Sequence, residues 1–129
     1  MRSSKSELPS LAPSTRRSPS GGTDDRVAEL RGRLQNRMWQ SAGIVRTDAG
    51  LVQARGELKL LAAEAEGLGS SVAGMELHNL LAVSLLVVEC ALRRAESRGL
   101  HYNEDHPKPD DRYQHDTVIS RSDLASAAA

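Results

Sequence analysis

The stretch MELHNLLAVSLLVVECALRRAESRG, residues 75–99, decides the fold of this chain. Drawn as a helix, its apolar side chains cover nearly the whole circumference, and a helix that is hydrophobic on all sides is a buried one. The arginines near its end complement the negative pole of a helix, and a glycine there can adopt the left-handed conformation that stops one. The sequence therefore predicts a central helix from Met75 to Arg98, closed by Gly99, with Leu100 turning back onto the last turn.

A shorter amphipathic helix is predicted near the N-terminus. It begins at Thr23 or Asp24, because either side chain can accept a hydrogen bond from a free backbone N–H at a helix start. Apolar residues follow at spacings of three and four, which places them on one face. They are Val27, Leu30, Leu34 and Met38. The pattern fades near Ser41, and Gly43 supplies a turn.

A second amphipathic helix is predicted after the start signal of Thr47 and Asp48, which follows a short apolar contact at Ile44 and Val45. Its apolar residues again alternate at spacings of three and four and form one face. They are Leu51, Ala54, Leu58, Leu61 and Ala65. Glycines in residues 67–69 end this helix before the central one begins.

These helices predict an all-α fold, a three-helix bundle with spectrin-like up-down-up topology. We expect residues 1–22 to be a disordered linker or transit-like segment, residues 23–106 the bundle, and residues 107–129 an extended, mostly irregular tail. Within the tail, residues 117–119 form a short strand or an extended arm along a neighbour. The central helix is about 36 Å long, so two shorter helices leave part of it uncovered. The uncovered part needs a partner, either another copy or another domain.

The composition narrows the function classes. Basic and acidic residues balance at 17 each, so no overall field favours nucleic acid or an anionic membrane, and neither is expected as a partner. The apolar run from Leu80 to Leu92 is shorter than the roughly 20 residues that a membrane span needs, and two polar residues interrupt it. The chain has no Phe, one Trp and two Tyr, which leaves little to stack on a flat cofactor ring.

The N-terminal segment leaves the compartment open. It is rich in Ser, Pro and Arg, as organellar transit segments are. Its three prolines disfavour the amphipathic helix of a transit segment and favour a linker. The localisation is therefore expected to be cytoplasmic, or plastid if this segment is a transit peptide.

Residues His101, Glu104, Asp105 and His106 have the side-chain types that bind zinc or iron. However, no predicted helix fixes their spacing and no further ligand pairs with them, so a solvated polar loop is the favoured interpretation. The single cysteine, Cys90, lies in the apolar stretch and is expected to act as a small buried hydrophobe. No nucleophile triad, Walker loop or G-x-G-x-x-G after a strand is present. We therefore assign no catalytic, cofactor-binding or metal-binding residue.

Three blocks of sequence resemble the C-terminal helical domain of L-aspartate oxidases. MWQSAGIVR at 38–46 resembles the start of that domain, and ELHNLL at 76–81 resembles its central helix. RAESRGLHY at 94–102, with Asp-His-Pro at 105–107, resembles the segment that ends this helix. The domain is shared with the flavoprotein subunits of succinate dehydrogenase and fumarate reductase, but the Gly-Ile-Val-Arg and Leu-His-Tyr elements favour the aspartate oxidase branch.

The resemblance implies a function that this chain does not perform alone. In a full-length relative, FAD oxidises L-aspartate to iminoaspartate, the first step toward quinolinate and NAD. The flavin and substrate contacts lie in FAD-binding and capping domains, and no position here matches them. We therefore expect a fragment or isolated domain that binds no cofactor by itself and has a structural role, docking on the FAD-binding domain of the same enzyme family.

The residues expected to dock are Trp39, Arg46, Arg98, His101 and Tyr102. For Arg98 two interpretations stay open: compensation of the helix dipole, or a clamp on a carboxylate or on backbone carbonyls of a neighbouring domain. The alternative function is a stand-alone helical adaptor that uses the same apolar face for self-association or for binding a partner.

Overall fold

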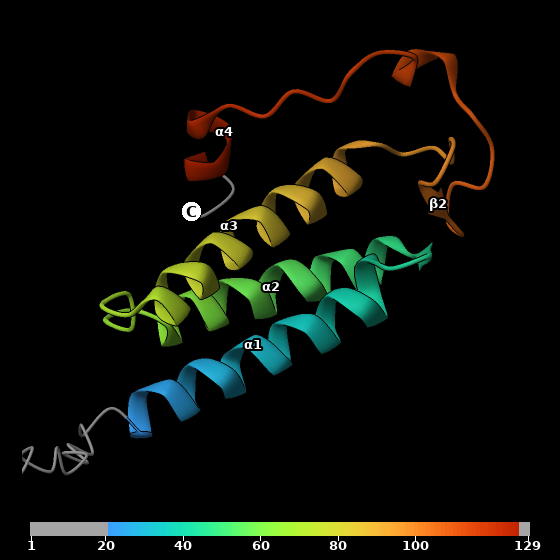
Figure 1. The fold of residues 1–129 in the computed structure, drawn as a ribbon. Helices are drawn as coiled ribbons and strands as arrows, with labels where there is room; N and C mark the ends of the chain where they lie inside the picture. The colour runs from blue at the N-terminus through green and yellow to red at the C-terminus, as the bar shows by residue number, and fades with distance from the viewer. Residues whose placement is uncertain (1–20, 127–129) are drawn as a thin grey trace, which may run out of the picture.

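The computed structural model describes residues 21–126 and confirms the predicted all-α three-helix bundle (Figure 1). Three long helices run up, down and up: α1 (Gly21–Ala42), α2 (Asp48–Glu64) and α3 (Val72–Arg93). The other elements are short: β1 (Val45–Arg46), β2 (Tyr102–Asn103), the 3-10 turn η1 (Asp111–Tyr113) and α4 (Arg121–Ser126). The expectations for residues 1–20 and 127–129 lie outside the described residues.

One face of each long helix forms the core. The inward residues predicted for the first two helices are buried, except that Met38 is only partly buried against the same core. The apolar core residues of α3 are Leu77, Leu81, Val88 and Ala91. They lie four, seven and three residues apart, which places them on a single helix face. The bundle is therefore built from leucine, valine and alanine.

The helix starts agree in part with the prediction. Thr47 caps α2 as expected, since its Oγ1 accepts the Gly50 N–H at 3.0 Å. α1 begins at Gly21, so the expectation that residues 21 and 22 belong to a disordered segment was wrong. Glycine is tolerated in a first turn, where the N–H groups have no helical partner. The apolar contact predicted for Ile44 and Val45 was also wrong, because both side chains are exposed and strand pairing fixes the backbone of Val45.

The predicted bounds of the central helix were wrong at both ends. α3 begins at Val72, where Ser71 Oγ accepts the Gly74 N–H at 3.1 Å, and it ends at Arg93 rather than Arg98. Beyond Arg93 the helical pattern is lost: the Arg94 N–H donates to Ala91 O at 3.3 Å, only three residues back, and the Ser97 and Arg98 N–H groups donate outside the helix, to Lys108 O at 3.2 Å and to His101 O at 2.9 Å.

Gly99 is left-handed, with φ of +60°, but it lies in the tight turn between Arg98 and His101 and not at a helix end. Leu100 does not turn back onto the helix, since 97% of its surface is exposed. The left-handed conformation was therefore predicted correctly, and its structural context was not.

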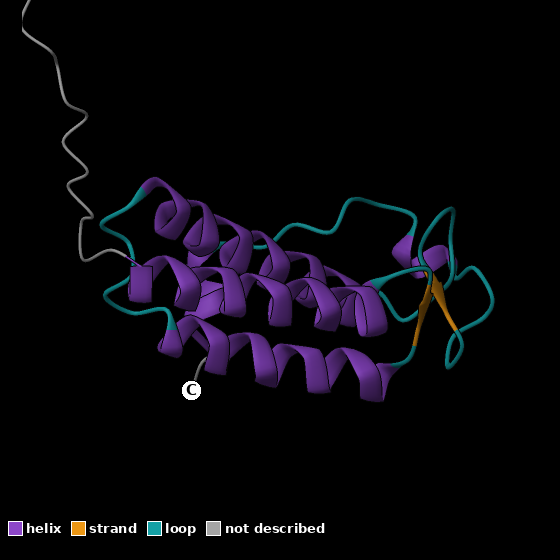
Figure 2. Ribbon diagram, turned by 60° about the horizontal axis from the view of Figure 1, so that its bottom comes forward, coloured by secondary structure: helices purple, strands orange, loops and turns teal. Residues whose placement is uncertain are grey.

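The tail departs from the prediction only in part, and an extended arm of residues 117–119 along a neighbour stays a prediction. Residues 117–119 form no strand, and the strand pairing lies instead between β1 and β2, which are parallel. Figure 2 shows these two strands at one end of the bundle. The tail runs back past α3 and ends in α4, a short helix that the sequence pattern did not indicate (Figure 1).

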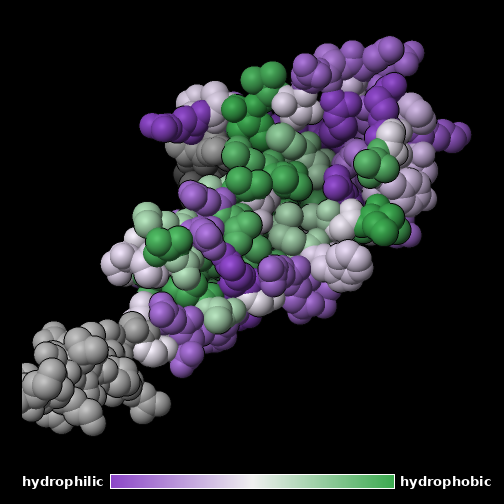
Figure 3. Space-filling view, viewed as in Figure 1, coloured by the Kyte–Doolittle hydropathy of each residue, from purple (hydrophilic) through white to green (hydrophobic). Residues whose placement is uncertain are grey.

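Part of α3 is left uncovered, as predicted, but the expected reason was wrong, because α1 is not shorter than α3: each has 22 residues. We define the uncovered face by its exposed large apolar residues: Val72, Met75, Leu80, Val83, Leu86 and Val87. Figure 3 shows hydrophobic side chains gathered in a band over this part of the bundle. By length and composition alone α3 resembles a membrane span, but a core helix passes the same test, and its other face packs on α1 and α2.

Candidate functional site at the end of the third helix

The segments that follow α1 and α3 meet at one end of the bundle. We call this region the corner and define it as residues 43–48 and 94–117. The parallel strands bring the segments together, with Val45 opposite Tyr102 and Arg46 opposite Asn103. The Glu104 N–H extends the pairing by donating to Arg46 O at 2.9 Å. Residues more than fifty positions apart therefore become neighbours.

Glu96 is the buried charge of the corner, with no exposed surface. Its carboxylate accepts from Arg98 Nε at 3.0 and 3.1 Å, from the Asp110 N–H at 2.8 Å and from Arg94 Nη1 at 2.6 Å. These bonds, that of Arg98 first, outweigh desolvation and lower the pKa of Glu96 to about 2. The side chain is therefore a carboxylate at neutral pH.

Arg94 holds the tail against the end of α3. Besides Glu96, its guanidinium donates to Tyr113 O at 2.7 Å, to His115 O and to Thr117 Oγ1 at 3.3 Å. A planar fork of donors suits such a set of oxygen acceptors. These bonds use its three nitrogens, so Arg94 is a structural clamp within the chain.

Asn103 and Asp48 tie the loop to the start of α2. Asn103 is buried, and its Nδ2 donates to Asp48 Oδ1 at 2.8 Å. His106 Nε2 lies 2.8 Å from the other oxygen of Asp48, and the Asp48 N–H donates to Asp105 Oδ2 at 2.7 Å. The hydrogen bond from Asn103, followed by that from His106, lowers the pKa of Asp48.

His101 bridges Arg46 and the main chain. Arg46 Nη1 lies 2.8 Å from His101 Nδ1, and His101 Nε2 lies 3.0 Å from Arg94 O. A guanidinium can only donate and a carbonyl can only accept, so this arrangement requires a neutral imidazole with its proton on Nε2. The ring therefore positions Arg46 without supplying a negative charge.

The loop of His101, Glu104, Asp105 and His106 is held by hydrogen bonds to the start of α2 and to Arg46, so it is not a free solvated loop. Over residues 21–126, no three His, Cys, Asp or Glu side chains form a group able to hold a metal ion. Its two histidines bond to different partners, Arg46 and Asp48. Three of these four side chains, those of His101, Asp105 and His106, thus fasten the loop to Arg46 and to the start of α2.

The residues expected to dock fall into two groups. Trp39 is 76% exposed and Tyr102 is 43% exposed, so both present aromatic surface to solvent. Arg98 is engaged internally, with Nε on Glu96 and Nη2 3.4 Å from Asp110 O. It is a clamp on a carboxylate and a carbonyl, as one interpretation had it, but those acceptors belong to its own chain. The dipole interpretation was wrong, because Arg98 lies outside the helix.

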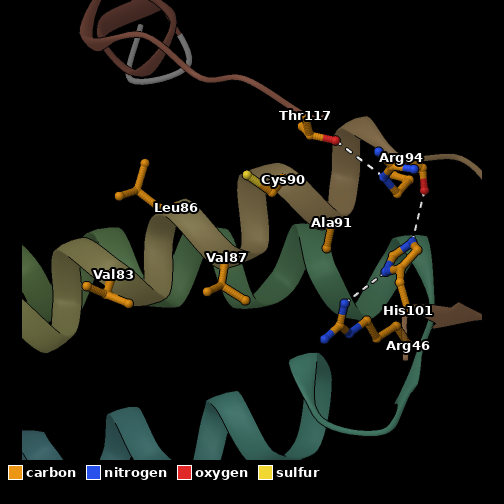
Figure 4. Close-up of a pocket in the computed structure, with 9 residues that line it drawn as sticks. All are labelled: Arg46, Val83, Leu86, Val87, Cys90, Ala91, Arg94, His101 and Thr117. Carbon is orange, nitrogen blue, oxygen red and sulfur yellow. Dashed lines mark hydrogen bonds between the residues drawn. The ribbon is translucent and has the colours of Figure 1, made fainter. Parts of the chain in front are cut away.

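A hollow of about 360 Å³ opens between the corner and the uncovered face of α3 (Figure 4). Val83, Leu86, Val87, Cys90 and Ala91 of α3 line its apolar wall. Arg46, Arg94 and His101 close one end, and Thr117 of the tail lies on its rim. Cys90 is only partly buried because it borders this hollow, so the expectation of a buried thiol was wrong.

The family of the chain follows from comparison with known proteins. The model of a family described as the fumarate reductase flavoprotein C-terminal region matches residues 31–127, which include most of the bundle and the whole corner. The chain belongs to this family. The resemblance to the C-terminal helical domain of L-aspartate oxidases, drawn from three blocks of sequence, is thereby confirmed.

Curated relatives of this flavoprotein family align with the same region. An L-aspartate oxidase of Vibrio cholerae is 43% identical over 74 residues, covering 54% of this chain. A chloroplastic L-aspartate oxidase of Oryza sativa is 35% identical over 120 residues, covering 86% of it. A fumarate reductase (CoM/CoB) subunit of Methanothermobacter marburgensis is 33% identical over 105 residues, covering 74% of it. The aligned part is only 14% of the first relative and 19% of the other two.

We expect the stability of the fold to fall as the pH drops from about 4.5 toward 2. The pKa of Glu96 is about 2 in the folded chain, against an ordinary value of 4.5. A carboxyl whose pKa is lower in the folded state stabilises the fold above its unfolded pKa and loses that contribution as the pH falls through the folded pKa. The lowered pKa of Asp48 acts in the same direction. Thermal unfolding followed by circular dichroism across this range measures the loss, and an unchanged melting temperature contradicts it.

Proposed function

We propose that this chain is the helical docking domain of an L-aspartate oxidase type of flavoprotein. It packs against the flavin-binding region of that enzyme through the uncovered face of α3 and the corner. The observation that carries this proposal is a long apolar face without cover in a member of a flavoprotein C-terminal family. Exposed apolar patches of this kind mark interaction surfaces.

The oxidation of L-aspartate belongs, on this proposal, to the assembled enzyme. FAD and L-aspartate bind in the flavin-binding region, and this chain by itself binds neither and catalyses nothing. Two observations support this division: the sequence contains no phosphate-binding glycine loop, and relatives named L-aspartate oxidase are several times longer than the aligned segment. The compartment follows that of the enzyme, cytoplasmic or plastid.

Within the proposed interface, Trp39 of α1 and the residues of the corner have different tasks. Trp39 and Tyr102 offer exposed rings that can be buried by a partner, as aromatic anchors commonly are. His101 fixes the direction of Arg46. Arg98 keeps the corner in shape through Glu96 and does not itself contact the partner.

Self-association is the second candidate. Outward positions of α3 at Val72, Glu76, Val83, Leu86 and Cys90 lie four, seven, three and four residues apart, which is the spacing of a helix-pairing seam. Size-exclusion chromatography with light scattering separates the two candidates. A stable dimer supports self-association, and a monomer supports the docking domain.

A chimaera tests the docking function. The segment of the Oryza sativa L-aspartate oxidase that aligns with this chain is replaced by the matching residues of this chain. We expect a folded enzyme with flavin absorbance that oxidises L-aspartate. In that chimaera, Val83→Asp is expected to reduce the yield of flavin-containing enzyme about tenfold or more, because it buries an unpaired carboxylate at the interface.

The matched control is Val52→Asp. Val52 of α2 is 49% exposed and Val83 of α3 is 57% exposed, but Val52 lies outside the uncovered face. The control variant should therefore behave like the unmodified chimaera. Equal losses from both variants, or an unmodified chimaera that does not fold, would overturn the proposed function.

A further inference from the structure

Arg46 is an arginine without a counter-charge. Every other partly buried arginine in residues 21–126 forms an ion pair with a carboxylate, but no carboxylate of this described part lies within ion-pair distance of Arg46. Its side chain contacts Gly43 O, 3.3 Å from Nε, and His101 Nδ1, 2.8 Å from Nη1. Burial lowers the pKa of its guanidinium, because the charged form is partly desolvated without compensation. A partly buried charge without a counter-charge destabilises the folded chain unless an anion pairs with it.

The groups around Arg46 do not supply that anion. His101 is a neutral acceptor in this geometry, with its only N–H directed at Arg94 O. The guanidinium of Arg94 is bound to Glu96 and to oxygens of the tail. Two carboxylates of the corner are engaged elsewhere, Asp48 with Asn103 and His106, and Glu96 with Arg94 and Arg98. The other described acids of the corner form no ion pair with Arg46.

The hollow beside Arg46 defines the shape of what binds there. Figure 4 shows Arg46 and His101 at one end and the side chains of Val83 and Val87 along α3 leading away from them. Within residues 21–126, Arg46 Nη2 and the second N–H of Nη1 meet no acceptor. A guanidinium with two free donors recognises a carboxylate by a pair of parallel hydrogen bonds. The surface that fits this hollow is therefore apolar and has a carboxylate at the end that meets Arg46.

We propose that Arg46 is the anchor of the interface and binds an aspartate or glutamate side chain of the flavin-binding region, whose neighbouring apolar side chains lie on Val83, Leu86 and Val87. This inference rests on the proposed function and specifies its partner chemistry. The pair of Arg46 and a carboxylate fixes the register of the docked region, while the uncovered face of α3 supplies most of the buried surface.

The first test uses this chain alone with butyrate as the probe. Butyrate combines a carboxylate with a short apolar chain, and butyramide has the same shape without the charge. In NMR titrations we expect butyrate, and not butyramide, to shift the Arg46 Nε–H signal together with the methyl signals of Val83 and Val87. Arg46→Gln is expected to weaken butyrate binding about tenfold, the loss of one charge-assisted contact.

The matched control for this titration is Arg121→Gln, because Arg121 is exposed and likewise forms no ion pair within the described part of the chain. It should bind butyrate like the unmodified chain. The spectra report whether each variant is folded, and Arg46→Lys, which keeps the charge, is a second variant that should retain binding. No response in the unmodified chain, or an equal response in Arg46→Gln, overturns the anchor.

The second test identifies the carboxylate in the chimaera. Arg46→Lys places an amine at the anchor, and a carbodiimide joins an amine to a carboxylate only when the two are in contact. Mass spectrometry is expected to find the amine at position 46 joined to an aspartate or glutamate of the flavin-binding region. If residue 46 is cross-linked only to acidic residues of the segment taken from this chain, Arg46 is not the anchor of the interface. This conclusion holds even if the Val83→Asp result supports docking. The two proposals can also fail separately in the other direction. If the chimaera does not fold but this chain binds butyrate through Arg46, docking is overturned and Arg46 remains a carboxylate-binding site.

Discussion

Replacing Leu77 with alanine is expected to lower the free energy of unfolding by about 2–5 kcal/mol. The Leu77 side chain is fully buried in the centre of the bundle, and its truncation removes apolar contacts and leaves a cavity between packed helices. A domain of this size has a total stability of about 5–15 kcal/mol, so one such change removes a large part of it. Urea unfolding followed by far-ultraviolet circular dichroism measures the difference.

The control is Leu80→Ala, the same substitution one turn further along α3. Leu80 belongs to the uncovered face and is 38% exposed, so the expected change lies within about 0.5 kcal/mol. Equal destabilisation by the two variants would contradict the faces that the structure assigns to α3. An effect of Leu80→Ala that grows with protein concentration would instead indicate that a second copy covers this face.

These two leucines show how far the sequence alone predicts the fold. The first two helices have one apolar face each, so spacing identified their inward residues, which are buried as predicted apart from the partly buried Met38. α3 is apolar on nearly all sides, and spacing cannot then decide which leucine faces the core. Its excess of apolar surface did predict that two helices leave it uncovered. Which residues remain exposed depends on how the helices pack, which only the structure shows.

The end of α3 could not be predicted from local signals. Arginines and a glycine at residues 93–99 are typical of a helix terminus. The helix nevertheless ends at Arg93, because Glu96 and Ser97 bond to residues 106–110, which follow only after the tight turn. A local pattern gives no information about such bonds. Contacts with residues distant in sequence therefore end the helix before the segment whose residues are typical of a helix terminus.

The corner was predicted only in outline. The resemblance pointed to Arg46 and His101, which the structure brings together across 55 positions. It did not indicate that Glu96 and Asn103 are buried or that Asp48 accepts a hydrogen bond from Asn103. Glutamate and asparagine are usually exposed, and no spacing marks a buried one. The one local pattern there, two arginines flanking a glutamate at 94–98, is equally compatible with the predicted helix.

Replacing Glu96 with glutamine is expected to lower the melting temperature by about 10 °C at neutral pH. The amide keeps the size of the side chain but removes the charge that Arg94 and Arg98 share. Two guanidinium groups then remain side by side without an anion, and the Asp110 N–H loses a charged acceptor. Removing one partner of a buried ion pair is strongly destabilising for this reason. The tail held by Arg94 should also become sensitive to proteolysis.

Two further variants test this reason. Glu104→Gln changes the same residue type in the same corner, but Glu104 is exposed, and its melting temperature should stay within about 2 °C of the unmodified chain. Adding Arg98→Met to Glu96→Gln removes one of the two unpaired cations. The double variant should therefore melt at a higher temperature than the sum of the two single effects predicts. Additive effects would mean that Arg98 and Glu96 act independently, and the buried carboxylate would not be the common acceptor that holds the corner together.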